Sequence, residues 1–300
     1  MTTPSTTSEV PWTILTLLKW TTSYFSSHAI DNPRSTAEVL LAHALKLKRI
    51  DLYLQYDRPM HVDELKGYKV LIKRRVAREP VAYITGTKEF WSLDFQVTRD
   101  VLIPRPETEC LVEASLEVMS KRGDNRPLNI LELGTGSGAV AIALAIQEPG
   151  HCYFASDISI KALAVARGNS ADQGQKKIHF FAGDWLAPVQ CSKAGFDLIV
   201  SNPPYIPKGD IRGLQPEIHR YEPIRALDGE NDGLGCLRCI IDEAPDCLVS
   251  GGGLLLEIGY GQREEVEAIV GHNGCYDEVS FDKDYSGIHR VARMSKAATD

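Results

Sequence analysis

The sequence predicts an α/β protein built on a doubly wound sheet, with a small bundle of helices ahead of it. Two observations lead to this fold class. From about residue 128 onward, short apolar runs alternate with segments of helical periodicity, as in a parallel sheet with helices on both faces. Residues 11–82 instead show apolar side chains at helical spacing. A length of 300 residues is enough for about two domains.

The first domain is predicted to be a bundle of roughly four or five helices. Apolar side chains recur at helix spacing at Leu40, Leu41, Ala44 and Leu45. Pro33 and Pro59 mark breaks between helices, because proline lacks the backbone donor that a helix interior needs. We place this helical domain at residues 1–86.

A β-hairpin is expected to connect the two domains, over residues 87–103. This segment is rich in strand-forming side chains, among them Phe90, Trp91, Phe95 and Val97. The second domain then covers residues 104–300. In it we expect strands at 129–133, 152–156, 178–181, 197–200, 253–258, 276–281 and 288–292, and helices at 111–119, 139–146, 161–169 and 237–248.

The composition argues against several classes of protein. A formal net charge of −7 is atypical of a general nucleic-acid binder, which usually carries a basic surplus. No apolar run approaches the ~18 residues of a membrane helix, and the first ten residues lack the charged start of a signal peptide. We therefore expect a cytoplasmic protein without direct nucleic-acid or membrane binding. Cys236 and Cys239 have no second cysteine pair or histidine cluster beside them, so no metal site is expected.

The charge is unevenly distributed, with a basic cluster at residues 66–78. Such a cluster is commonly a solvated helix face. The alternative is a docking surface for an acidic partner or for RNA.

The strongest local signal is a glycine-rich loop between a predicted strand and a predicted helix, formed by Gly134, Thr135, Gly136, Ser137 and Gly138. Glycines allow a ligand to approach the backbone, and the helix start offers free N–H groups. The next strand ends at Asp157, where a ribose-binding carboxylate belongs. After the third strand, Asp184 can accept from an exocyclic amine and Trp185 can stack on a purine, unless Trp185 is a core residue. These features suit any adenosine-containing cofactor, a dinucleotide included.

A second signal follows the fourth predicted strand, at Asn202, Pro203, Pro204 and Tyr205. Two consecutive prolines stiffen the loop and remove two backbone donors, so that carbonyl acceptors remain. The Asn202 side-chain oxygen and the Pro203 carbonyl can hold both hydrogens of a planar NH2 group. Tyr205 can attract a cation through its π face. This array would orient a weakly nucleophilic nitrogen toward an electrophilic methyl group.

Together these segments resemble a known family. The glycine-rich loop combined with Asn202 to Tyr205 is similar to class I methyltransferases that act on planar nitrogens. The stretch Pro104-Arg105-Pro106-Glu107-Thr108-Glu109 narrows the resemblance to the HemK/PrmC family, the release factor glutamine methyltransferases. Segments 78–86, 226–229, 232–234, 254–259 and 284–287 also match, so the resemblance covers most of the chain.

The resemblance implies a seven-stranded, Rossmann-like sheet and S-adenosyl-L-methionine as the cofactor. It implies methyl transfer to the side-chain amide nitrogen of the glutamine in the Gly-Gly-Gln motif of peptide-chain release factors. The residues implied in cofactor binding are Gly134 to Gly138, Asp157, Asp184, Trp185 and Asn202. Those implied in binding the substrate are Asn202, Pro203, Pro204, Tyr205, Arg105 and Glu107. Arg105, Glu107 and Thr108 would also shape the cofactor entrance or the path to it. The helical domain would recognise the release factor, and a monomer is expected.

Three other functions stay open at this point. An adenine amino-methyltransferase could use the same tetrapeptide, but it would need to flip a base and would be expected to carry a basic groove. A nicotinamide-dependent oxidoreductase could use the glycine-rich loop, but it leaves residues 202–205 without a role. A non-catalytic scaffold could retain the same fold.

Overall fold

The computed structural model describes residues 12–122, 126–175, 177–189 and 195–298. The chain forms two compact units, which divide between Gly86 and Thr87. Among the described residues, no helix combines the length and the apolar character that crossing a bilayer requires.

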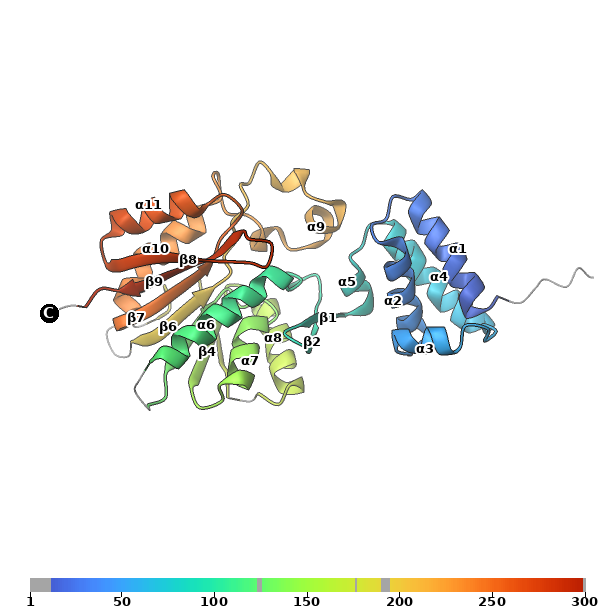
Figure 1. The fold of residues 1–300 in the computed structure, drawn as a ribbon, viewed down its shortest axis with the longest axis horizontal. Helices are drawn as coiled ribbons and strands as arrows, with labels where there is room; N and C mark the ends of the chain where they lie inside the picture. Colours follow the sequence, from blue (N-terminus) through green and yellow to red (C-terminus); the bar gives the residue numbers. More distant parts are fainter. Residues whose placement is uncertain (1–11, 123–125, 176, 190–194, 299–300) are drawn as a thin grey trace, which may run out of the picture. The chain divides into compact units, whose positions relative to one another are not determined.

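The first unit is helical, as the sequence predicts (Figure 1). Its helices are α1 (Ile14–Ser27), α2 (Pro33–Leu45), α3 (Arg49–Leu54), α4 (Val62–Val76) and α5 (Val81–Thr85). Pro33 lies in the first turn of α2, where its missing N–H would be unbonded in any case. All five helices contribute apolar side chains to the core of this unit. Among them are Phe25, Leu40, Leu41, Leu52, Tyr68 and Ile72.

The second unit begins with the predicted hairpin, β1 (Thr87–Phe90) and β2 (Leu93–Gln96), paired antiparallel. Phe90 and Phe95 are buried in the core of this unit. The Gln96 N–H also donates to the Asn169 side chain at 2.8 Å. The hairpin therefore packs as part of the second unit.

The main sheet has seven strands in the order β5-β4-β3-β6-β7-β9-β8. They are β3 (Asn129–Leu133), β4 (Cys152–Asp157), β5 (His179–Ala182), β6 (Phe196–Ser201), β7 (Leu248–Glu257), β8 (Tyr276–Lys283) and β9 (His289–Lys296). The first five are parallel, whereas β9 runs antiparallel to both of its neighbours. The prediction of a seven-stranded doubly wound sheet is confirmed.

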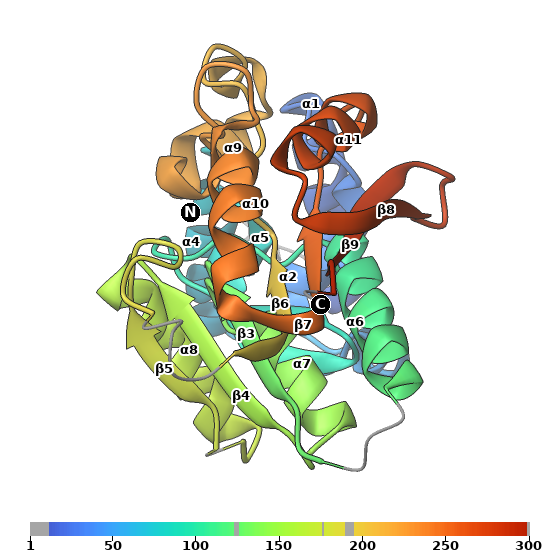
Figure 2. The same ribbon diagram turned by 90° about the vertical axis from the view of Figure 1, so that its left-hand side faces the viewer.

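Helices cover both faces of this sheet (Figure 1, Figure 2). Alternate residues of each strand point to opposite faces. Ile130, Leu198 and Leu255 therefore pack with α6 (Glu109–Lys121) and α7 (Ala139–Gln147). Leu131, Ile199 and Leu254 pack with α10 (Gly235–Cys247) and α11 (Arg263–Asn273) on the other face. The remaining helices of the unit are α8 (Ile160–Asp172) and the short α9 (Pro216–Tyr221).

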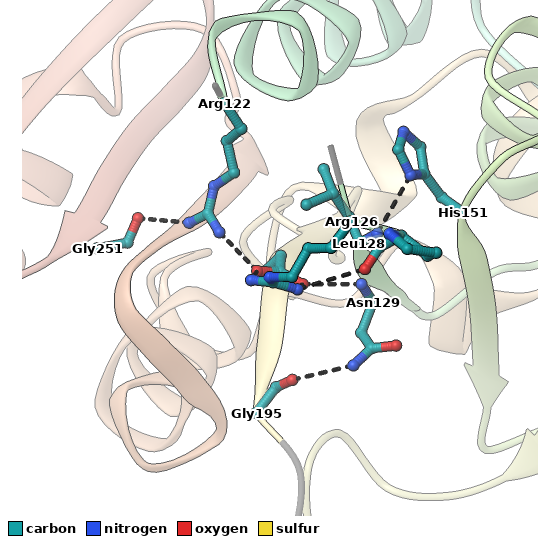
Figure 3. Close-up of polar contacts among 9 residues, drawn as sticks. Arg122, Arg126, Leu128, Asn129, His151, Gly195 and Gly251 are labelled. Atoms are coloured by element: carbon teal, nitrogen blue, oxygen red, sulfur yellow. Dashed lines mark hydrogen bonds and ion pairs between the residues drawn. The ribbon is translucent and has the colours of Figure 1, made fainter. Parts of the chain in front are cut away.

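A charge cluster around the buried carboxylate of Asp197 stabilises the amino end of the sheet (Figure 3). Asp197 is the second residue of β6. Its carboxylate pairs with Arg122 and Arg126 and accepts from the Asn129 N–H at 2.9 Å. Arg122 also donates to the Gly251 carbonyl at 2.6 Å, which ties α6 to β7. Burial alone would raise the pKa of Asp197, but the hydrogen bonds and the two positive charges hold that pKa below its usual value.

Candidate active site

The glycine-rich loop connects β3 to α7, and the buried side chain of Glu132 accepts hydrogen bonds from the loop and from α7. The Thr135 hydroxyl donates to Glu132 Oε2 at 2.5 Å, and the Ala141 N–H donates to the same oxygen at 3.0 Å. Burial raises the pKa of Glu132 to about 8. Glu132 therefore connects the loop to the first turn of α7.

Gly138 allows α7 and α8 to approach each other at the end of the loop. A Cβ atom at this position would lie 2.9 Å from Ile142 Cδ1 and 3.1 Å from Ala166 Cβ. The backbone of Gly138 also has φ +83°, a conformation that side chains disfavour. Thr135 and Ser137 are buried. These three residues shape the loop from within and do not line the cavity described next.

Asp157, at the end of β4, supports the loop from the side. Its Oδ2 accepts from the Gly136 N–H and its Oδ1 from the Ser159 N–H, both at 2.8 Å. Burial raises the pKa of Asp157, although these two bonds and the charge of Arg225 oppose the rise. One side chain thus fixes the glycine-rich loop and the start of α8 together.

A cavity of about 760 Å³ opens at the carboxyl ends of the parallel strands. The predicted cofactor residues that line it are Gly134, Gly136, Asp157, Asp184, Trp185 and Asn202. Its volume falls within the range of small-molecule sites. The position also agrees with the rule that open α/β sheets bind ligands where the strand order reverses, here between β3 and β6.

Trp185 has a strained backbone at this cavity. Its φ is +43°, which is unusual for a bulky residue and is often found at functional sites. The ring lies against the glycine-rich loop, because a Cβ added at Gly134 would be 3.6 Å from Trp185 Cζ3. The ring is partly buried against the core and also lines the cavity.

Asn202 follows β6 and belongs to two cavities. Besides the large cavity, it lines a second one of about 160 Å³ together with Pro203, Pro204 and Tyr205. Its side-chain Nδ2 donates to the Thr108 hydroxyl at 3.0 Å, so its Oδ1 is left as an acceptor. The site therefore consists of a large cavity and a small one that share the lining residues Leu102, Asn202, Pro204 and Ala226.

Arg105 and Glu107 differ in their relation to this site. Arg105 lines the small cavity, and its guanidinium pairs with the buried carboxylate of Glu222. The Ile103 N–H donates to the same carboxylate at 3.2 Å. Glu107 is exposed and lines neither cavity.

Comparison with known proteins places the chain in a family. Residues 16–86 match the PrmC N-terminal domain, and residues 112–213 match the methyltransferase small domain. The release factor glutamine methyltransferase of Geobacter sulfurreducens is 42% identical over 280 residues, which are 93% of this chain and 95% of that protein. The chain belongs to the release factor glutamine methyltransferase family. Its relative of the same name in Chlorobaculum tepidum is 39% identical over 288 residues, covering 94% and 97% of the two chains.

The predicted family is thus confirmed, and the enzyme is an S-adenosylmethionine-dependent methyltransferase. Solved structures agree on the fold. A methyltransferase from Pyrococcus furiosus superimposes with a TM-score of 0.50 at 17% identity, covering 78% of this chain and 98% of that one. The hMettl16 catalytic domain, in complex with the MAT2A 3'UTR hairpin 6, gives 0.56 at 13% identity, covering 75% and 82%. At these identities the likeness concerns the fold alone.

Three residues that sequence reasoning missed also shape the enzyme's site. Arg99 and Arg225 line the large cavity and add positive charge to it, and Arg99 lies over the Tyr221 ring at 5.1 Å. Gln262 Nε2 donates to the Tyr205 carbonyl at 3.0 Å, while its Oε1 accepts from the Gly259 N–H at 2.8 Å. None of the three stands in a motif, so no local pattern indicated them.

Proposed function

We propose that the enzyme methylates the side-chain amide nitrogen of the glutamine in the Gly-Gly-Gln motif of a peptide-chain release factor. The observation that supports this most directly is the place of Asn202 where the two cavities meet. With its Nδ2 bonded to Thr108, Asn202 offers an oxygen to a planar NH2 group in the small cavity. The NH2 group of a glutamine side chain is a hydrogen-bond donor, and the Asn202 oxygen is the acceptor that it requires.

The large cavity fits S-adenosylmethionine, and we assign its lining residues to the cofactor. Asp157 would accept from the ribose hydroxyls, because each of its oxygens has a further lone pair beyond its backbone bond. Trp185 would stack on the adenine, and Asp184 would accept from the adenine amine. Arg99 or Arg225 would pair with the carboxylate of the cofactor. When bound, the cofactor supplies an electrophilic methyl group on its sulfonium.

The small cavity is assigned to the glutamine side chain. The Asn202 oxygen and the Pro203 carbonyl would accept its two N–H hydrogens and so point the nitrogen at the methyl group. These acceptors also favour the positive charge that develops on nitrogen during transfer. Tyr205 would line one side of the amide, and Arg105 would form the wall near the substrate path.

We further propose that the helical first unit recognises the release factor. On α4 the side chains of Lys66, Lys69 and Lys73 are exposed. Other members of the basic cluster serve the fold of the unit itself: Arg74 pairs with Glu79, Arg75 is buried, and Arg78 donates to the Ala29 carbonyl at 2.7 Å. The three lysines are therefore the part of the cluster that can meet an acidic partner.

The decisive experiment is methyl transfer from labelled S-adenosylmethionine to a purified release factor, with the motif glutamine intact or changed to alanine. We expect label only on the intact protein. Asn202→Ala should reduce transfer about 100-fold or more, the usual effect of removing one group that stabilises the transition state. Asn273→Ala, a similar deletion on α11, is the control and should retain wild-type activity. Label on adenine in nucleic acid, with none on the release factor, would overturn the proposed substrate.

A charge reversal tests the recognition surface. Replacing Lys66, Lys69 and Lys73 by Glu should raise KM for the release factor and leave KM for the cofactor unchanged, because rim charges act on association. An unchanged KM for the release factor would remove this surface from the proposal.

A further inference from the structure

Behind Asn202 lies a short chain of buried polar side chains. Asn202 Nδ2 donates to Thr108 Oγ1 at 3.0 Å, and the Thr108 residue is only 5% exposed. Glu257, at the end of β7, is 1% exposed. Its Oε1 accepts from the Tyr205 hydroxyl at 3.4 Å, whereas its Oε2 has no hydrogen-bond partner in the described part of the chain. Buried acceptors without a partner are uncommon and usually have a reason.

The direction of this chain follows from counting hydrogens. A threonine hydroxyl has one hydrogen to give, and Thr108 accepts from Asn202, so its own hydrogen must go to another acceptor. Oε2 of Glu257 is a buried acceptor without a donor among the described residues, so it can take this hydrogen. Burial raises the pKa of Glu257 to about 7, against the opposing effects of the Thr108 hydroxyl and of the positive charge of Arg290.

We propose that Thr108 and Glu257 are positioning residues, which together hold the Asn202 amide with its oxygen toward the substrate. Glu257 takes the Thr108 hydrogen, so Thr108 presents a lone pair to Asn202, and Asn202 must turn its NH2 group inward. This inference rests on the proposed function, since it matters only if the substrate presents N–H donors to Asn202.

Orientation matters because the two ends of an asparagine amide have nearly the same shape and opposite hydrogen-bonding character. A flipped Asn202 would place its own NH2 against the NH2 of the substrate. Neither group could then accept, and the nitrogen of the substrate would lose its alignment. Glu257 has a second effect through its other oxygen, because the Tyr205 hydroxyl donates to it and the ring of Tyr205 lines the small cavity.

The test compares two substitutions at Thr108. Thr108→Val removes the hydroxyl with little change in shape, and Thr108→Ser keeps it. We expect Thr108→Val to lower kcat for methyl transfer about 10- to 100-fold, with the Kd for S-adenosylmethionine within about twofold of wild type. Thr108→Ser should recover most of that loss. Ser115→Ala removes another buried hydroxyl, on α6 outside both cavities, and should leave kcat unchanged.

A double-mutant cycle separates positioning from general destabilisation. In an Asn202→Ala background, Thr108→Val should cost less than about twofold in single-turnover transfer, because Thr108 acts through Asn202. Full additivity of the two losses would overturn the proposed chain.

A spectroscopic measurement tests the hydrogen bond between the Asn202 NH2 group and Thr108 without any substrate. In protein labelled with 15N-asparagine, the side-chain signal of Asn202 is assigned by its loss in Asn202→Ala. Thr108→Val should shift this signal and speed its hydrogen exchange, while Thr108→Ser should not. If the Asn202 signal and its hydrogen exchange are unchanged in Thr108→Val, the inference is overturned. Absence of label on the release factor with the wild-type enzyme would instead overturn the proposed function.

Discussion

Asp157→Asn is the substitution that best tests the assignment of the large cavity. The change keeps the shape of the side chain, but it exchanges one acceptor oxygen for a donor NH2 group. Both carboxylate oxygens of Asp157 accept a backbone N–H at 2.8 Å, one from Gly136 and one from Ser159. The variant can satisfy only one of them.

The expected loss of cofactor affinity has two parts. Removing a charged acceptor from a ribose hydroxyl costs about 1.5–3 kcal/mol. A backbone N–H that faces the new NH2 group costs up to about 1–3 kcal/mol more, if the glycine-rich loop must hold its shape. Together the two parts amount to about 1.5–6 kcal/mol, and since about 1.4 kcal/mol corresponds to tenfold in affinity, the Kd for S-adenosylmethionine should rise roughly 10- to 20,000-fold.

The fold should tolerate this change. Burial raises the pKa of Asp157, which means that the ionised side chain is itself poorly solvated there. A neutral amide relieves that cost and offsets part of the lost bonding. The midpoint of thermal unfolding without cofactor should therefore fall by only a few degrees.

Calorimetry of cofactor binding is the appropriate assay, with thermal unfolding of the same samples. Asp172→Asn on α8 is the matched control, because Asp172 bonds Gln96 and lies outside the cavity lining. A Kd for Asp157→Asn within twofold of wild type, in a stable protein, would refute the assignment of Asp157 to the cofactor.

Three further predictions concern stability and the shape of the site. Asp197→Asn should lower the free energy of unfolding in urea by about 2–4 kcal/mol, because two arginines lose their buried partner. Since the folded pKa of Asp197 is depressed, wild type should lose this advantage as pH falls below about 4, and equal acid sensitivity of the two proteins would contradict the argument. Glu132 has a folded pKa raised to about 8, so its ionisation in the unfolded state should cost wild type stability as pH rises from about 4.5 to about 8. Glu132→Gln should gain in melting temperature over wild type across that window, and a constant difference would contradict it. Gly233→Ala should reduce methyl transfer more than about tenfold with cofactor affinity little changed, because a Cβ there would lie 2.5 Å from the Tyr205 carbonyl oxygen. Unchanged transfer would show that this carbonyl has room to move.

Much of the fold could be predicted because the buried strands are short and strongly apolar. The strand at residues 129–133 was located correctly, since Ile130, Leu131 and Leu133 are all buried between two layers of helices. Helix α11 was not predicted, because Val266 and Val270 are its only buried residues and such a narrow apolar stripe gives a weak periodic signal. The antiparallel position of β9 between β7 and β8 is a property of the sheet that no local pattern contains.

In the candidate site, too, some features could be predicted from the sequence and others could not. Residues such as Gly134, Asp157 and Asn202 stand in motifs and could be proposed directly from the sequence. The contacts that orient them could not, because they join distant parts of the chain. Thr108 and Asn202 are 94 positions apart, and Gln262 is 57 positions from Tyr205. Gln262 and Tyr205 meet only once β7 lies beside β6, and Thr108 and Asn202 meet only once the start of α6 packs near the end of β6.

The buried carboxyl groups show why the two ends of this sheet have different roles. At the amino end, arginines compensate Asp197 and its pKa is lowered. At the carboxyl end, burial raises the pKa of Glu132, Asp157 and Glu257, whose hydrogen bonds come from hydroxyl and backbone groups. A buried carboxyl group with a raised pKa costs stability near neutral pH, because it must either take up a proton or lose its hydration on folding. These acids stand beside the glycine-rich loop and the loop that carries Asn202, the two segments that we propose to bind the ligands. The carboxyl end thus gives up stability for a defined site geometry, and the ion cluster at the amino end helps to offset that loss.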